Sequence, residues 1–135
     1  MLDAIDSAGT GLSAYRTMLD TTAYNIANVN TARATNQPAF AGQYVQLQEL
    51  GAGADGVGQG VEVKSLQTGD TTGRMTYDPT NPLADTQGYV RLPDIDLSDQ
   101  MTNMIIAERG FQANASAVSR AKDVYDAAIA IGKGA

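Results

Sequence analysis

Cysteine and histidine are both absent from this chain of 135 residues. Without cysteine the chain has no disulfide framework and no thiol chemistry, and its redox compartment is left open. Without either residue, and without a Gly-x-Ser-x-Gly turn, the common pairs of nucleophile and general base are missing. We therefore expect a protein that is not an enzyme, with no catalytic residues, no metal site and no cofactor.

Charge is also scarce. Nine basic against fifteen acidic residues give a net charge of −6, and no basic cluster marks a phosphate-binding face, so the sequence argues against nucleic acid as a partner. Charged residues make up 18% of the chain, below the roughly 25% that is usual for soluble domains. Such a surface loses its water easily against other copies of the chain, although the same composition also suits a merely neutral surface.

Long apolar runs are missing as well. No segment approaches the roughly 20 apolar residues that span a bilayer, so we expect no direct membrane insertion. The first residues, MLDAIDSAGTGLSAYRT, have acidic side chains where a secretory signal has positive charge, and they form no continuous apolar run. The expectation is a protein that is either cytoplasmic or exported without a cleaved signal.

Helix-breaking residues are concentrated in the middle of the chain and rare at its ends. All four prolines and nine of the fourteen glycines fall between residues 38 and 93. At the front, an apolar stripe with alternating spacings of three and four predicts a helix over residues 3–29. Its members are Ile5, Ala8, Leu12, Tyr15, Leu19, the polar Thr22, Ile26 and Val29. Gly9 and Gly11 predict a late start near Gly11, and Asn28 and Asn30 predict an end in the left-handed conformation.

A second stripe of the same spacing predicts a helix over residues 98–131. Its members are Leu97, Met101, Met104, Phe111, Ala115, Val118, Tyr125 and Ile129, and the face is widened by Ile105, Val124, Ala128 and Ile131. Asp96 or Ser98 is expected to cap this helix, Gly110 to mark a kink or a close helix contact, and Gly132 and Gly134 to end it. The matched stripes predict that the two ends pack together as a coiled-coil-like pair.

The middle of the chain has the composition of short strands and loops. Strands are predicted at residues 40–50, 61–66, 74–77 and 88–92, with a flexible glycine-rich connection at 51–60 that lacks the pattern of a phosphate-binding loop. The predicted fold is therefore mainly α with a small β element. We divide it into an N-terminal helix at 1–31, a β-rich middle at 32–93 and a C-terminal helix at 94–135.

One carboxylate cluster, Asp94, Asp96 and Asp99, invites comparison with a cation site. Calcium loops need more oxygen ligands and a glycine turn, so capping of the second helix is the better interpretation. The stripes leave two alternatives open: the interior of an ordinary monomeric helix pair, or surfaces that need neighbouring copies to cover them.

Three stretches of the sequence resemble flagellar rod, hook and related axial proteins. AYNIANVNT, residues 23–31, resembles the Ser/Ala-x-Asn-x-Ala-Asn-x-x-Thr signature at the end of their first helix. ERGFQAN, residues 108–114, is similar to the Ala/Ser-Arg-x-Tyr-Gln-Ala-Asn motif of their last helix, with Phe111 at the aromatic position. Residues 77–101, YDPTNPLADTQGYVRLPDIDLSDQM, look like the segment before the last helix in the proximal rod members. The motif positions are Asn25, Ala27, Asn28, Thr31, Asn81, Pro82, Leu83, Ala84, Gly88, Tyr89, Val90, Pro93, Arg109, Gln112, Ala113 and Asn114.

The resemblance implies a structural subunit of the proximal rod in the bacterial flagellar basal body, located in the periplasm. Its implied partners are other rod proteins, copies of itself and the flagellar type III export apparatus, which exports such proteins without cleaving a signal. The terminal helices would pack between subunits around a channel, in a helical tube that transmits torque. The expected subunit interface comprises Ile5, Leu12, Tyr15, Leu19, Ile26, Val29, Met101, Met104, Phe111, Val118, Tyr125 and Ile129. Asn25, Asn28 and Asn114 would satisfy hydrogen bonds where helix ends meet.

Other interpretations stay open at this point. A soluble coiled-coil adaptor would bind a partner helix through the face formed by residues 97–129. Another axial protein of the rod would share the motifs at residues 23–31 and 108–114. An enzyme would use Asp94, Asp96 and Asp99 as a metal site.

Overall fold

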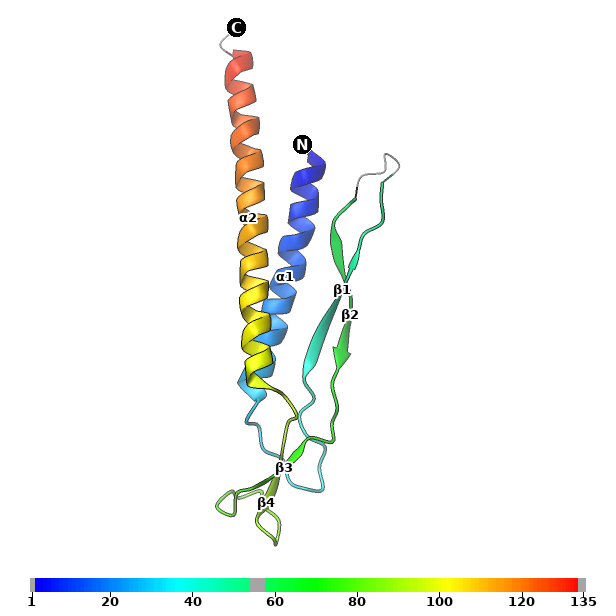
Figure 1. The fold of residues 1–135 in the computed structure, drawn as a ribbon, viewed down its shortest axis with the longest axis vertical. Helices are drawn as coiled ribbons and strands as arrows, with labels where there is room; N and C mark the ends of the chain where they lie inside the picture. The colour runs from blue at the N-terminus through cyan, green and yellow to red at the C-terminus, as the bar shows by residue number, and fades with distance from the viewer. Residues whose placement is uncertain (1, 54–57, 134–135) are drawn as a thin grey trace.

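The computed structural model describes residues 2–53 and 58–133, whose elements lie along one long axis (Figure 1). Two antiparallel helices, α1 (Leu2–Asn28) and α2 (Leu97–Lys133), lie side by side. A hairpin of β1 (Gln43–Glu49) and β2 (Val61–Thr68) follows α1 on its other flank. A second hairpin, β3 (Arg74–Tyr77) and β4 (Tyr89–Leu92), lies beyond the end of the helix pair that is far from both termini. The predicted class, mainly α with short strands, is confirmed, although the strands form two sheets rather than one.

Two glycines let the helices approach closely. A methyl group at Gly110 would lie 2.5 Å from the Tyr15 ring, and one at Gly11 would lie 2.6 Å from Oδ1 of Asn114. These contacts, here called the glycine contacts, explain why two helix-weakening residues occur inside long helices. The predicted late start near Gly11 is wrong, because α1 begins at Leu2 and the packing at Gly11 offsets its low helix propensity.

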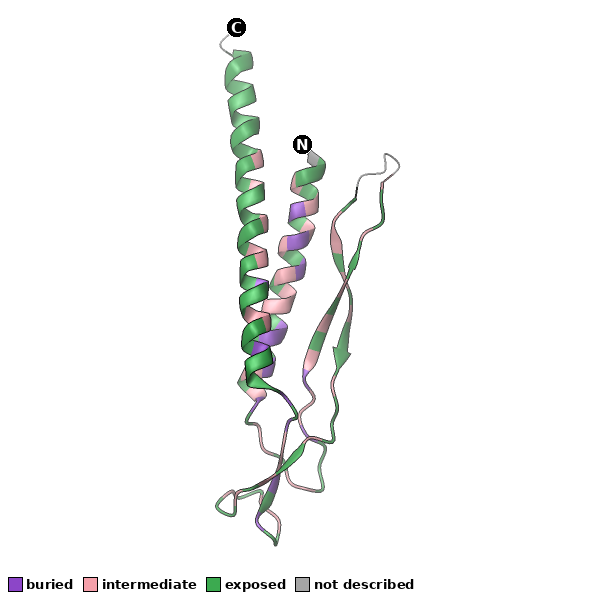
Figure 2. Ribbon diagram, viewed as in Figure 1, coloured by how far each residue is buried: buried purple, intermediate pink, exposed green. Residues whose placement is uncertain are grey.

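The stripe predicted for α2 is only partly the one that packs on α1. The buried and half-buried side of α2 faces α1 (Figure 2) and is formed by Gln100, Asn103, Met104, Ala107, Gly110, Phe111, Asn114, Val118 and Ala121. Leu97, Met101 and Tyr125 were predicted in this seam but are 44%, 55% and 54% exposed. Backbones this close leave room in the seam for small side chains such as Ala107, which is fully buried, whereas Tyr125 lies on the part of α2 that extends beyond α1.

The last three turns of α2 extend beyond α1. Helix α2 has 37 residues and α1 has 27, a difference of roughly 15 Å at about 1.5 Å per residue. Every residue from 122 to 133, a segment here called the overhang, is exposed (Figure 2). The overhang therefore has no packing partner within the described part of the chain.

The helix ends are fixed by side-chain hydrogen bonds. Oδ1 of Asp96 accepts hydrogen bonds from the backbone N–H groups of Ser98 (2.7 Å) and Asp99 (3.2 Å), which confirms Asp96 as the cap of α2. At the end of α1, Nδ2 of Asn28 donates to the Tyr24 carbonyl at 2.9 Å. No described residue other than glycine has a positive φ, so the predicted left-handed asparagine is wrong. Helix α2 also continues through Gly132, contrary to prediction, and Gly134 lies outside the described residues.

The long hairpin is antiparallel, with a bulge between Gln46 and Leu47. An isolated bridge between Ala52 and Gly58 extends it, and residues 54–57 of the predicted flexible connection lie outside the described residues. The hairpin is joined to α1 where the Val61 N–H donates to Oγ1 of Thr10 at 3.0 Å. This bond is one of the links between the hairpin and the helix.

The hydrophobic core is built largely of alanine. Within the described residues the buried apolar side chains are Ala8, Ala14, Val29, Ala39, Val90, Ile95 and Ala107. Because alanine buries little apolar area, this core stabilises the fold less than one built of leucine and isoleucine. The larger apolar side chains lie mostly outside it.

Candidate subunit interface

Helix α2 exposes two groups of large apolar side chains. The first group, Leu97, Met101, Ile105 and Ile106, lies beside the helix pair, and the second, Val124, Tyr125, Ile129 and Ile131, lies on the overhang. Their exposed fractions range from 39% to 77%. Exposed apolar surface of this kind is typical of protein–protein contacts. Ile106 escaped sequence analysis because it falls outside the alternating spacing of three and four.

The interface residues expected from sequence divide into two sets. Nine of them are buried or half-buried within the chain itself: Ile5, Leu12, Tyr15, Leu19, Ile26, Val29, Met104, Phe111 and Val118. Met101, Tyr125 and Ile129 are exposed and available to a neighbour. The stripes therefore combine the seam of one helix pair with positions that the chain leaves exposed.

Asn25, from the first motif, connects three elements. Its side chain is 1% exposed. Nδ2 donates to the Gln43 carbonyl at 2.7 Å and to Oε1 of Gln100 at 2.9 Å, while Oδ1 accepts from the Gln43 N–H at 2.8 Å. Because buried amides need such partners, Asn25 fixes the start of β1 and the start of α2 to the end of α1.

The other motif asparagines make local bonds. Oδ1 of Asn28 accepts from Oγ1 of Thr31 at 3.1 Å, and Nδ2 of Asn114 donates to the Gly110 carbonyl one turn earlier at 2.8 Å. Asn114 also packs on Gly11 across the helix pair. The remaining positions of these two motifs, Ala27, Arg109, Gln112 and Ala113, are exposed.

The motif at residues 77–101 begins with a compact loop between β3 and β4. Oδ1 of Asn81 accepts from the Leu83 N–H at 3.1 Å, and Oδ1 of Asp85 accepts from the N–H groups of Gln87 (2.9 Å) and Tyr89 (3.0 Å). Gly88 has φ +83°, where a methyl group would lie 2.8 Å from the Tyr77 ring. The motif residues thus supply the turns that the loop requires.

The carboxylates of this loop are stabilised in their charged form. The backbone hydrogen bond from Tyr89 lowers the pKa of Asp85 below its ordinary value of 3.8. Hydrogen bonds from the side chains of Thr80 and Asn81 lower the pKa of Asp78 in the same direction. Hydrogen bonds to the charged form are the physical cause in both cases.

One side of the loop is anchored to the rest of the chain, and the other side is exposed. Val90 is 1% exposed, and Arg91 donates to the Thr35 carbonyl at 2.6 Å and to the Thr72 carbonyl at 2.8 Å. Tyr77 and Tyr89 pack edge to face with 5.4 Å between ring centroids, and both remain partly exposed, as does Leu83. We describe the exposed side chains of Tyr77, Leu83 and Tyr89 as the tyrosine patch.

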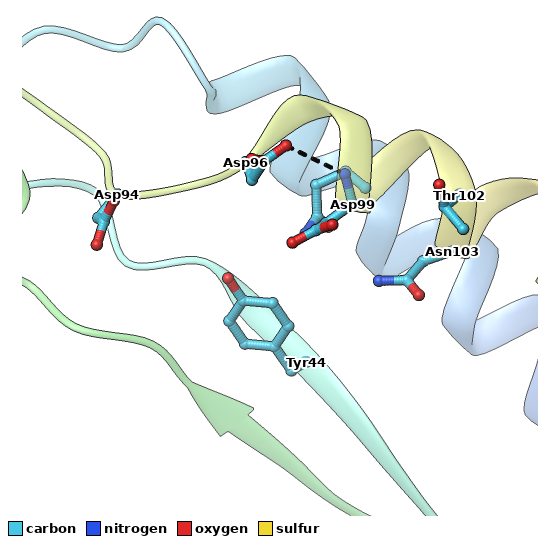
Figure 3. A pocket seen from close by; sticks show the side chains of 7 residues that line it. Tyr44, Asp94, Asp96, Asp99, Thr102 and Asn103 are labelled. Atoms are coloured by element: carbon cyan, nitrogen blue, oxygen red, sulfur yellow. Dashed lines mark hydrogen bonds between the residues drawn. The ribbon is translucent and has the colours of Figure 1, made fainter.

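A groove lies between β1 and the start of α2. Its outer part has a volume of about 530 Å³ and is lined by Tyr44, Asp94, Asp96, Asp99, Gln100, Thr102 and Asn103. Figure 3 shows Asp99 and Asn103 on one side and Tyr44 on the other. Within the described parts of the chain, no group of three carboxylates is arranged to hold a metal ion.

Two family models match the chain. "Flagella basal body rod protein" matches residues 5–35, which cover most of α1, and "Flagellar basal body rod FlgEFG protein C-terminal" matches residues 86–131, which include most of α2. None of the described helices is long and apolar enough to cross a membrane. The helix pair and these matches define a rod-type axial protein of the bacterial flagellum.

Curated relatives specify the kind of rod protein. The chain is 31% identical to the flagellar basal-body rod protein FlgC of Borreliella burgdorferi, over 99% of both chains. It is 31% identical to FlgC of Yersinia enterocolitica over 98% of both chains, and 32% identical to FlgC of Aquifex aeolicus over 93% of this chain and 92% of that one. The chain belongs to the FlgC family of flagellar basal-body rod proteins. It is therefore a structural component of the motility apparatus and not an enzyme.

Proposed function

We propose that this subunit assembles with other rod proteins and with copies of itself into the proximal part of the rod. The observation that carries the proposal is the contrast between an alanine-rich core and the large apolar side chains exposed along α2. Covering those side chains in an assembly removes apolar surface from water. Each Å² removed stabilises the assembly by about 25 cal/mol. The long helices then form the wall of a helical tube around the export channel.

In this proposal the tube transmits torque through many contacts. The α2 surfaces contact neighbouring helices, and the tyrosine patch contacts subunits at larger radius. The interface positions on the inner seam, such as Leu19 and Phe111, contribute indirectly because they hold each helix pair together. The division into two helical ends and a β-rich middle stays a prediction.

The proposal also includes a route and a location. The subunit would leave the cell through the flagellar type III export apparatus without loss of a signal peptide, and assemble in the periplasm. A chain with a small core and few buried large side chains unfolds at low cost, which suits export in an unfolded state.

Substitutions on the overhang test the assembly. Tyr125→Glu combined with Ile129→Glu should lower the amount of the chain in purified basal bodies by at least about tenfold, because burying carboxylates in an apolar contact costs more than 1.4 kcal/mol. Swimming should be lost, while the circular dichroism of the purified variant should stay unchanged, since both side chains are exposed.

The matched control is Ser116→Glu combined with Ser119→Glu, which adds the same charge at exposed polar positions of the same helix. This control should assemble normally. Normal swimming of the overhang variant would contradict the proposal, and so would a wild-type chain that is absent from purified rods.

A further inference from the structure

The groove beside the start of α2 continues inward between the helices. Its inner part, about 150 Å³, is lined by Met18, Thr21, Thr22, Gln43, Tyr44, Val45, Gln100 and Asn103. Tyr44, Gln100 and Asn103 line both parts, so the two form one surface, here called the α2 groove. It is bounded by α1, β1 and α2.

The floor of the α2 groove contains polar groups that the fold leaves unused. Thr22 is 5% exposed, and among the described residues no hydrogen bond uses its hydroxyl group. Gln100 is 3% exposed; its Oε1 accepts from Asn25, and its Nε2 has no bond within residues 2–53 and 58–133. Among the described residues, Arg91 Nε is the one enclosed side-chain polar atom without a partner, so the Thr22 hydroxyl and the Gln100 amide nitrogen open onto the groove, where a ligand can bond to them.

The rim of the α2 groove is acidic. Asp94, Asp96 and Asp99 line it, and none of the described residues that line it is basic. Asp96 is engaged as the cap of α2, whereas the side chains of Asp94 and Asp99 are exposed (Figure 3). Met18, Val45 and the Tyr44 ring give the interior apolar surface against which an aliphatic stem can pack.

We propose that the α2 groove binds a lysine- or arginine-bearing segment of a neighbouring rod subunit. The cationic group pairs with Asp94 and Asp99 at the rim, the stem of the side chain packs on Met18 and Tyr44, and polar groups of the segment bond to Thr22 and Gln100. Charge complementarity selects this occupant, because an acidic segment would face like charges. The inference rests on the proposed assembly of the chain into the rod.

Neutralising the rim tests the proposal. Asp94→Asn combined with Asp99→Asn should lower incorporation into purified basal bodies by at least about fivefold, as expected when charge pairs at a protein contact are removed. Asp6→Asn combined with Asp20→Asn is the matched control, since both are exposed acidic residues of α1, and it should assemble normally. Equal incorporation of the rim variant and the wild type would overturn the proposal.

Thr22→Val tests the floor without changing charge. Because the hydroxyl has no hydrogen-bond partner among the residues that the structure describes, this isosteric change should leave the unfolding midpoint of the purified chain unchanged or raised. It should still reduce incorporation. An unchanged incorporation would show that the hydroxyl meets no ligand and would overturn this part of the proposal.

A photo-crosslinker at Thr102, an exposed position of the groove wall, identifies the occupant. In purified basal bodies, benzoylphenylalanine at this position should form an adduct with a rod subunit, at a peptide with lysine or arginine within a few residues of the attachment point. An adduct at an acidic or uncharged peptide, or no adduct, would overturn the proposal. Absence of the wild-type chain from the rod would instead contradict the proposed function itself.

Discussion

At the scale of single residues, the same residue type has opposite effects at different positions of the helix pair. Gly11 and Gly110 each lie against a side chain of the other helix, whereas nothing lies within 4 Å of a methyl group placed at Gly9. Glycine weakens a helix by about 1 kcal/mol relative to alanine. Close packing offsets that cost at Gly11 and Gly110. At Gly9 no described contact offsets it.

Alanine substitutions should separate these cases. Gly9→Ala should raise the free energy of unfolding by about 0.5–1 kcal/mol, because it improves helix propensity without a clash. In Gly110→Ala the added methyl group meets the Tyr15 ring, and such overpacking usually costs about 1–3 kcal/mol. The free energy of unfolding of Gly110→Ala should therefore be lower than that of Gly9→Ala by about this amount. Urea unfolding followed by circular dichroism at 222 nm measures both, and equal stabilities would contradict the packing seen at Gly110.

Resemblance to known proteins identified Asn25 but not its partners. Gln43 and Gln100 are 18 and 75 positions away, and no local pattern indicates that distance. Its location near the end of a predicted helix was visible in the sequence. The bonds that join α1, β1 and α2 required the tertiary structure.

At the scale of elements, the loop between β3 and β4 depends on a charged carboxylate. Asp85 accepts two backbone hydrogen bonds, and the one from Tyr89 is the larger cause of its lowered pKa. A carboxyl group whose pKa is lower in the folded state binds fewer protons there than in the unfolded state. Its stabilising effect is therefore complete above the ordinary pKa and is lost as the pH falls through the folded value.

Acidification below pH 3.8, the ordinary value, should loosen this loop. Protection of the Gln87 and Tyr89 amides, measured as the exchange rate relative to that of an unstructured peptide at the same pH, should fall as Asp85 is protonated, since its neutral form is a weaker acceptor. In Asp85→Asn, where the side chain does not titrate, the contribution of this residue to the pH dependence should disappear. Nuclear magnetic resonance of the two amides measures the effect, and the same pH profile in both proteins would exclude Asp85 as its origin.

Whether a segment forms a helix was easier to predict than which side of the helix packs against its neighbour. Long helices at both ends follow from periodicity and from the absence of proline, and the observed bounds of α2 lie within two residues of prediction. The face of α2 was partly wrong, because Ala107 and Asn114 fill the seam in place of larger neighbours. Apolar periodicity cannot reveal that choice, since it depends on how closely two backbones approach.

At the scale of the whole molecule, packing is uneven along the long axis. The buried positions of α2 lie where it runs beside α1, whereas the overhang has none. Helix segments without tertiary contacts are marginally stable in water. The chain therefore has a stable middle and an end whose order depends on its surroundings.

Hydrogen exchange should report this difference. In dilute solution the amides of residues 124–132 should exchange at least about tenfold faster than those of residues 104–118, because local opening costs less where fewer contacts are lost. In purified rods the overhang should become protected. Strong protection of the overhang in a confirmed monomer would contradict its dependence on neighbours.

The glycine contacts also fix how far one helix can slide along the other. A displacement by one turn, about 5.4 Å, would move the Tyr15 ring from Gly110 onto a position that has a side chain. Asn114 would lose its place at Gly11 in the same movement. A pull along the long axis therefore meets steric resistance at two points. The two helices resist sliding past each other, and the length of the pair stays constant under load.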